Sequence, residues 1–199
     1  MNLDFEKEYR SEYGTLICGI DEAGRGPLCG PVCAAAVILK ENAVIDGLND
    51  SKKLSEKKRE ELFDVIKDNS VSYGIAFATP QEIDELNILN ATFLAMKRAV
   101  LMCKPSPVFA LVDGNRIKGL DIPAECVVKG DSKSPSIAAA SVLAKVTRDR
   151  YMCELDQDYP QYNLSSHKGY PTKMHYELIK KYGIRDFYRK SFLKNLSEK

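Results

Sequence analysis

Three acidic residues stand where the sequence predicts that strands end, and a fourth stands just before a predicted helix. Asp21 and Glu22 follow one apolar run, and Asp113 follows another. If these two strands lie side by side, the three carboxylates enter one cleft at the sheet edge, where Asp131, just before a predicted helix, would complete a group of four. Carboxylates gathered in this way raise one another's pKa values unless cations neutralise them. The pattern therefore predicts a site for hard divalent cations.

Such a site supports phosphodiester hydrolysis. Mg²⁺ and Mn²⁺ prefer oxygen ligands and share their coordination with substrate phosphates. Two such ions about 4 Å apart activate a water and stabilise the leaving oxygen of an in-line displacement at phosphorus. The only two histidines, His167 and His175, lie in one short segment, so no nucleophilic triad is expected. We interpret both as structural or phosphate-adjacent.

Each acidic position also has a plainer explanation. Asp113-Gly114 alone is a common turn signal. Asp21 and Glu22 could be solvated turn residues, and Asp131 could be a helix cap, although Ser134 suits that task better. The repetition of carboxylates at strand ends is what favours a shared site.

The elements that must position these carboxylates are strands and helices in mixed order. Apolar runs predict five strands, at residues 15–20, 32–39, 71–78, 108–112 and 125–128. Helices are predicted after caps at Ser55 and Thr79 (the latter over about 80–103), from Ser134-Pro135, and from Pro171 to a stop at Gly183. This order predicts an α/β fold with a mixed five-stranded sheet flanked by helices, and we expect residues 1–199 to form a single domain.

Composition narrows the class of protein. The 199 residues are 44% hydrophobic and 29% charged, without an apolar run that could span a membrane or a signal-peptide layout, so a cytoplasmic protein is expected. Six cysteines without a CxxC pair predict free buried thiols rather than zinc ligands or disulfides. Residues 165–199 carry nine Lys/Arg and three Asp/Glu, a local charge of +6. This basic segment suits contact with a phosphate backbone, although a solvated basic helix would look the same.

The loop Gly24-Arg25-Gly26 follows the first carboxylate pair. It is not a dinucleotide-binding fingerprint, because Cys29 stands where the third glycine is required. Glycines flanking an arginine instead let backbone N–H groups approach a sugar or a phosphate closely.

Other basic and aromatic residues are weaker candidates. Lys52 precedes a helix and could hold a phosphate, although exposed lysines are usually only solvated. Tyr170 precedes a proline, which favours an extended backbone and a fixed ring; the alternative is that it packs as a hydrophobic staple. Surface ion pairs are the expected role of three residues on the helix after Ser134: Lys145, Arg148 and Arg150.

Five sequence blocks together resemble bacterial ribonuclease HII, in order from about residue 14 to about residue 190: GIDEAGRGPLCGPV, DSKKLS, LVDGN, KGDSKSPSIAAASVLAKVTRDR and HKGYPTKMH. The resemblance implies a ribonuclease H-like fold with a basic helical extension, about 160–199, over the substrate. It implies a two-metal Mg²⁺ or Mn²⁺ site held by Asp21, Glu22, Asp113 and Asp131. Contacts to the substrate are implied for Gly24, Arg25, Gly26 and Tyr170, the last near the RNA-to-DNA junction, and for Lys52.

The implied activity is endonucleolytic hydrolysis of the RNA strand of RNA–DNA hybrids. It includes cleavage on the 5′ side of single ribonucleotides embedded in duplex DNA, leaving 5′-phosphate and 3′-hydroxyl ends, and we expect a monomer. Ribonuclease HIII is disfavoured because it usually carries an additional N-terminal domain, and only about 13 residues precede the first strand here. More distant alternatives are another ribonuclease H-fold nuclease, such as a resolvase, and a nucleic-acid-binding module without catalysis.

Overall fold

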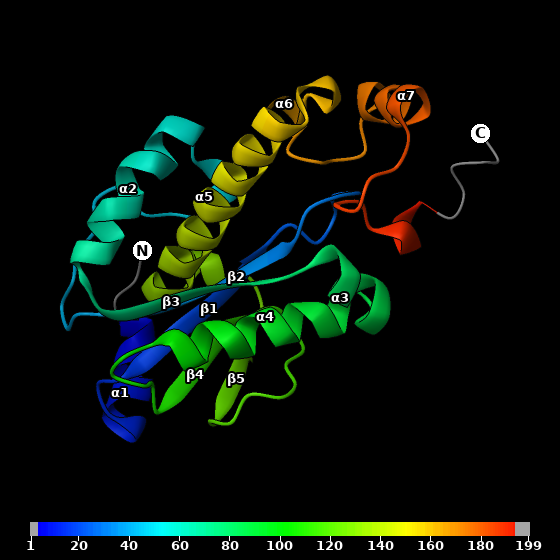
Figure 1. Ribbon diagram of the computed structural model, residues 1–199. Helices are drawn as coiled ribbons and strands as arrows, with labels where there is room; N and C mark the ends of the chain where they lie inside the picture. Colours follow the sequence, from blue (N-terminus) through cyan, green and yellow to red (C-terminus); the bar gives the residue numbers. More distant parts are fainter. Residues whose placement is uncertain (1–3, 194–199) are drawn as a thin grey trace.

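The computed structural model describes residues 4–193 as a sheet between two groups of helices (Figure 1). The strands are β1 (Ile17–Ala23), β2 (Val32–Leu39), β3 (Ser70–Ala78), β4 (Phe109–Asp113) and β5 (Ala124–Val127), in the spatial order β3-β2-β1-β4-β5. β2 pairs antiparallel with β1 and β3, whereas β4 pairs parallel with β1 and β5. The predicted mixed five-stranded α/β sheet is confirmed.

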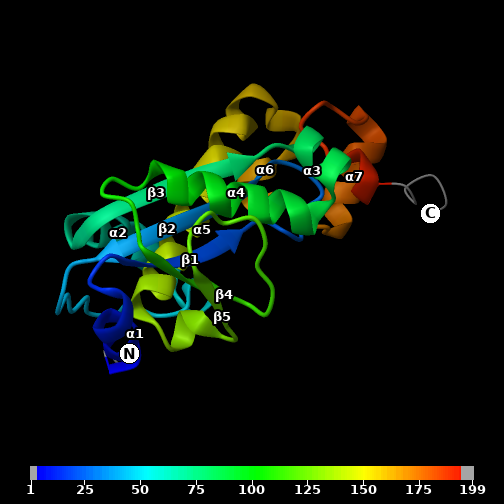
Figure 2. The same ribbon diagram turned by 90° about the horizontal axis from the view of Figure 1, so that it is seen from below.

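Helices cover both faces of this sheet. The described helices are α1 (Asp4–Tyr13), α2 (Glu56–Asp68), α3 (Pro80–Leu86), α4 (Ile88–Met102), α5 (Pro135–Asp158), α6 (Leu164–His167) and α7 (Lys173–Tyr182). α2 and α5 lie on one face, and α3 and α4 lie on the other (Figure 1). The view from below shows α4 crossing the sheet, with α6 and α7 beyond one end of it (Figure 2). β2 is buried along its whole length because it lies between the two helical layers.

Small residues let α5 pack directly on β1. Gly19 of β1 lies so close to the first turn of α5 that a methyl group there would sit 2.2 Å from the backbone N of Ile137. The first ten residues of α5, 135–144, are rich in alanine and are all buried. Ser134 caps the helix by accepting a hydrogen bond from Ile137 N, as predicted.

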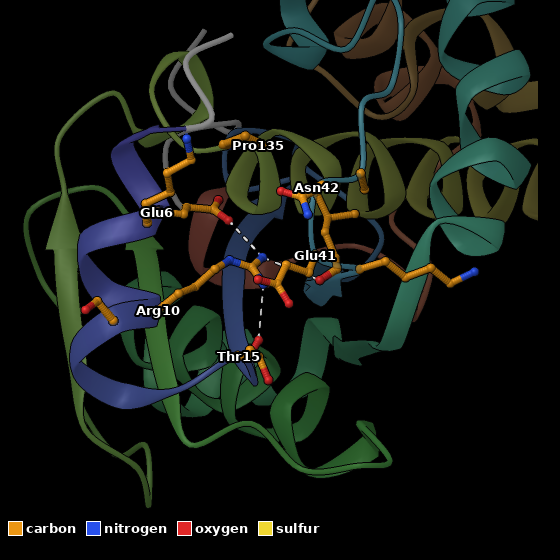
Figure 3. Close-up of a pocket in the computed structure, with 11 residues that line it drawn as sticks. Glu6, Arg10, Thr15, Glu41, Asn42 and Pro135 are labelled. Carbon is orange, nitrogen blue, oxygen red and sulfur yellow. Dashed lines mark hydrogen bonds and ion pairs between the residues drawn. The ribbon is translucent and has the colours of Figure 1, made fainter.

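The N-terminal helix α1 was not predicted, and it supports the start of α5. The buried Glu6 carboxylate accepts hydrogen bonds from Ser134 Oγ at 2.5 Å, Ser136 N at 2.8 Å and Ser136 Oγ at 2.9 Å. Beside Glu6, a cavity of about 330 Å³ opens between α1, the end of β2 and Pro135 (Figure 3). Arg10 crosses this cavity toward Thr15.

Two of the predicted helix boundaries are wrong. The single helix expected over about 80–103 is two helices, because Asn87 adopts a left-handed φ of 66° and its side chain caps α4 by accepting from Leu89 N and Asn90 N. α7 begins at Lys173 with Thr172 as its cap, rather than at Pro171. The caps at Ser55 and Thr79 and the helix end at Gly183 are confirmed.

Two expectations from composition can be compared with the described residues. All six cysteines are unpaired, and four of them are buried. No helix in residues 4–193 is long and apolar enough to cross a membrane. The predicted extension over about 160–199 includes α6 and α7, which lie beyond the end of the sheet where β1 ends (Figure 1), whereas residues 194–199 are outside the described part.

Candidate active site

Asp21, Glu22 and Asp113 lie at the same edge of the sheet. β1 and β4 are parallel neighbours, and Ile20 pairs with Val112, so the next residue on each strand is an acid: Asp21 on β1 and Asp113 on β4. β1 runs further than predicted, to Ala23. Asp21 and Glu22 therefore lie within the strand, just before its last residue, and not beyond its end. Asp21 is only 4% exposed.

Asp131 reaches this edge through a short 3₁₀ turn, η2 (Gly130–Ser132). The preceding backbone N–H, that of Gly130, donates to Asp113 Oδ1 at 2.7 Å, which ties η2 to the end of β4. Asp131 itself is 7% exposed. All four carboxylates singled out in the sequence are therefore gathered around the ends of β1 and β4.

Burial and the charges of neighbouring acids raise the pKa values of three of these acids, Asp21, Glu22 and Asp131. Burial, followed by the charges of Glu22 and Asp113, raises the pKa of Asp21 well above its usual value. Burial also raises the pKa of Glu22, although Arg25, whose Nη1 lies 3.3 Å from Glu22 Oε1, opposes the effect. The pKa of Asp131 is raised by burial and then by the charges of Asp113 and Asp50. The pKa of each of these acids is therefore raised in part by the charge of an acid on a neighbouring strand or loop.

Lys52 is a second cation, besides Arg25, that faces this cluster. It lies in η1 (Ser51–Lys53), where Asp50 caps the turn by accepting from Lys52 N at 2.9 Å. Burial opposes the charge of Lys52, but Asp21, Asp50, Asp131 and Asp113 together raise its pKa. Asp50 is an acidic neighbour that the sequence did not single out, although it stands in the DSKKLS block.

The donor set suits hard cations, although its present side-chain arrangement is not that of a closed metal cage. Among residues 4–193, no three His, Cys, Asp or Glu side chains form a ready-made metal site. Glu22 is turned toward Arg25, and Asp113 Oδ1 accepts from Gly130 N. Four oxygen-donating acids lie together, and burial followed by the charges of neighbouring acids raises the pKa values of Asp21 and Asp131, so the set fits divalent ions that prefer oxygen ligands.

The Gly24–Gly26 loop and Tyr170 lie side by side. Arg25 and Gly26 are exposed, and a methyl group at Gly26 would lie 3.6 Å from Cε1 of the Tyr170 ring. Tyr170 is 41% exposed, so the alternative of a buried hydrophobic staple is wrong. Lys145 Nζ lies 5.9 Å from the centre of the Tyr170 ring.

Both histidines hold the backbone beneath Tyr170. Their rings stack with centroids 4.0 Å apart. His175 Nδ1 lies 2.9 Å from Tyr170 O and its Nε2 lies 3.0 Å from Tyr188 Oη, an arrangement that suits a neutral ring with the proton on Nδ1. Burial lowers the pKa of His175 to about 4 and also lowers that of His167. Both histidines are buried and contact backbone atoms, which favours the structural interpretation over the phosphate-adjacent one.

The expectation that Arg148 is a surface ion-pair residue is wrong. Arg148 is 1% exposed and donates to three backbone carbonyls, those of Pro31, Cys29 and Lys168. Lys145 does pair with Asp149, and Arg150 pairs with Glu60. Arg189, which the sequence did not suggest, is also fully buried beneath the same loop.

A cavity of about 290 Å³ adjoins the carboxylates. Its lining includes Glu22, Arg25 and Asp113, together with Asn115 and Arg116. An apolar side of α4 that includes Phe93 completes it. Asn115 and Arg116 follow Asp113 directly in sequence, but only the fold shows that they line a space next to the acids.

Comparison with known proteins identifies the family. The model of the family described as Ribonuclease HII matches residues 18–195. The chain belongs to this family. Ribonuclease HII of Clostridioides difficile (strain 630) is 58% identical over 96% of this chain and 75% of the relative. That of Psychromonas ingrahamii is 54% identical over 96% of this chain and 94% of the relative.

Solved structures share the fold. Ribonuclease H2 from Pyrococcus horikoshii OT3 aligns with a TM-score of 0.78 and 28% identity, over 92% of this chain and 97% of that chain. A ribonuclease HIII solved in complex with Mn²⁺ aligns with a TM-score of 0.71, but at 18% identity it shows the fold alone. The predictions of a ribonuclease H-like fold and of an endonuclease that hydrolyses RNA are confirmed by the family.

Proposed function

We propose that this chain cuts the RNA strand of RNA–DNA hybrids and the 5′ side of single ribonucleotides in duplex DNA, with Asp21, Glu22, Asp113 and Asp131 as ligands of two Mg²⁺ or Mn²⁺ ions. The observation that carries the proposal is the parallel pairing of β1 with β4, which sets Asp21 beside Asp113. When bound, the ions supply an activated water and stabilise the leaving oxygen at phosphorus. The products are 5′-phosphate and 3′-hydroxyl ends.

The chain's own residues orient the substrate. Arg25 and Gly26 are exposed, so we assign their backbone N–H groups to hydrogen bonds with a ribose or a phosphate of the substrate. A protein distinguishes RNA from DNA at one position by sensing the 2′-hydroxyl, and a glycine-flanked backbone allows that approach without reading sequence. Tyr170, beside Gly26, is available to stack at the RNA-to-DNA junction.

Positive charge attracts the nucleic acid backbone. Lys52 faces the acids and is assigned to a substrate phosphate. The basic residues of α7 and the segment after it, part of the +6 charge of residues 165–199, are assigned to the duplex flanking the cut. An archaeal ribonuclease HII from Archaeoglobus fulgidus was solved in complex with PCNA. For the present chain we propose a cytoplasmic enzyme that acts as a monomer.

The test is cleavage of an end-labelled DNA duplex that contains one ribonucleotide, in Mg²⁺ and in Mn²⁺, with the cut position mapped. Wild type is expected to cut once, on the 5′ side of the ribonucleotide. Asp21→Asn is expected to keep its melting temperature and its duplex affinity while its cleavage rate falls by at least about a hundredfold, since a ligand of the reacting centre is lost.

Two results would contradict the proposal. Full activity of Asp21→Asn removes the ligand assignment. Cleavage of a four-way junction in preference to the ribonucleotide duplex points to a resolvase-like nuclease, and binding without cleavage in either ion points to a non-catalytic module.

A further inference from the structure

Arg189 is a buried cation whose partners are backbone carbonyls. It is 0% exposed, and its guanidinium donates to Gly30 O at 2.9 Å, Pro27 O at 2.8 Å, Arg25 O at 3.1 Å and Gly24 O at 2.6 Å. It makes no ion pair with any acid in the described part of the chain. A fully buried guanidinium without a carboxylate is costly, so four well-aligned acceptors are needed to hold it.

The carbonyls held by Arg189 decide where the neighbouring N–H groups point. In a planar trans peptide the C=O and the following N–H point in opposite directions. Because Gly24 O and Arg25 O face the guanidinium, the N–H groups of Arg25 and Gly26 face away from it, toward solvent. Neither N–H group is hydrogen-bonded to another of residues 4–193. Two successive outward N–H groups form a concave donor pair for an oxygen atom of a ligand.

The fold fixes Arg189 from both sides. Its own N–H donates to Leu28 O at 3.0 Å, and Gly30 N donates to Phe187 O at 2.8 Å, so residues 187–189 run antiparallel to the loop. On the other side, Asp84 of α3 accepts from Lys190 N and Ser191 N, each at 2.9 Å. These contacts hold the backbone of residues 187–191 beside the loop, and the guanidinium lies beneath it.

Arg148 completes the support. Its guanidinium donates to Cys29 O and Pro31 O at the end of the loop and to Lys168 O, two residues before Tyr170. A methyl group on Gly24 would sit 2.0 Å from Arg148 Nε, so the loop rests on this side chain. Arg148 thus joins the loop to the segment that carries Tyr170.

We propose that Arg189 is a positioning residue that sets selectivity for a ribonucleotide, by holding the loop so that the Arg25 and Gly26 N–H groups face the sugar. The inference rests on the proposed function, because it assigns the substrate ribose to this loop. Lysine at position 189 has a single amino group, which cannot reach four carbonyls in the plane of a guanidinium. The loop would then lose its fixed orientation while the carboxylate cluster stays untouched.

The experiment compares the affinity for a duplex with one ribonucleotide against that for the same all-DNA duplex, in EDTA and well below the melting temperature. Arg189→Lys is expected to lower this affinity ratio by roughly tenfold, the value of one hydrogen bond of about 1.4 kcal/mol. Partial unfolding would lower both affinities equally and leave the ratio unchanged. Arg10→Lys is the matched control, because Arg10 also donates to two backbone carbonyls, those of Thr15 and Leu39, at the cavity in Figure 3.

Three outcomes would contradict either the positioning role of Arg189 or the proposed function. A folded Arg189→Lys with the wild-type ratio overturns the positioning role. If that variant does not fold, Asp84→Asn is used instead, because it loosens residues 190–191. It is expected to lower the affinity ratio by about threefold, which corresponds to half of one hydrogen bond in free energy. An unchanged ratio in Asp84→Asn would likewise overturn the positioning role. If wild type itself prefers neither duplex, the proposed function fails rather than the role of Arg189.

Discussion

Replacing Gly19 with alanine tests the close packing of β1 on α5. A Cβ atom at this position would lie 2.2 Å from Ile137 N, 2.2 Å from Ser136 C and 2.6 Å from Ser136 O. All three are backbone atoms at the start of a helix, so no side chain can turn aside, and α5 must shift by roughly an ångström, to a normal carbon contact of about 3.5 Å. We therefore expect a cost of about 3 kcal/mol, the upper end for an overpacked core.

That cost converts into a large change in melting temperature. An unfolding entropy of about 2.1 cal/mol/K per residue gives about 0.4 kcal/mol/K for this chain, so 3 kcal/mol corresponds to about 7 °C. Circular dichroism during heating measures it. Gly26→Ala is the control, because its methyl group would only touch the Tyr170 ring at 3.6 Å. A melting temperature of Gly19→Ala within about 2 °C of wild type would refute the packing argument.

Three further substitutions separate recognition, helix support and pH dependence. Tyr170→Ala is expected to slow cleavage at a single ribonucleotide at least about tenfold more than cleavage of a long hybrid, because one stacked junction is lost; equal losses on the two substrates would exclude junction sensing. Glu6→Ala removes the acceptor of Ser134 Oγ and of two Ser136 donors, and should cost about 2–4 kcal/mol in urea unfolding, with Glu6→Gln intermediate. The folded pKa of His175 is about 4 against the usual 6.5, so the unfolded chain gains a proton first as pH falls. The contribution of His175 to the free energy of unfolding is complete above about pH 6.5 and declines by up to about 3 kcal/mol toward pH 4. His175→Gln should therefore make the decline of stability with falling pH shallower than in wild type. The contributions of the acidic residues are the same in both proteins and cancel in this comparison.

The strands and the acidic cluster were predictable because their signals are local. Apolar runs mark β1 and β4, and acidic residues follow each run. Burying a charged acid among apolar side chains costs free energy, so acids at these positions stand out in the sequence. Parallel pairing then brings Asp21 and Asp113 together without further information. Helix caps such as Ser134 are likewise visible in sequence, because capping depends on one side chain and the backbone two or three residues later.

The supports of the site were not predictable, because their partners are backbone atoms. Arg148 and Arg189 look like ordinary surface cations in sequence, and the carbonyls that bury them leave no mark on residue types. Asn87 breaks a segment whose apolar spacing favours one continuous helix, since a left-handed residue depends on tertiary packing. Glu6 is one of many acids in a charged N-terminal segment, and only the fold shows it capping α5.

The buried arginines Arg148 and Arg189 bind backbone carbonyls, not carboxylates, and this difference affects the charge of the site. A salt bridge would cancel each guanidinium, whereas carbonyl oxygens stabilise it and leave its charge in place. Burial, followed by the charge of Arg148, lowers the pKa of Arg189 to about 9, so Arg189 remains cationic at neutral pH. The site therefore has negative charge at the ends of β1 and β4 and positive charge beneath the Gly24–Gly26 loop. Under the proposed function, a phosphodiester lying between divalent ions held by the acids and this loop would be attracted at both ends, and removing the charge of Arg189 would weaken the hold on the phosphate as well as the order of the loop.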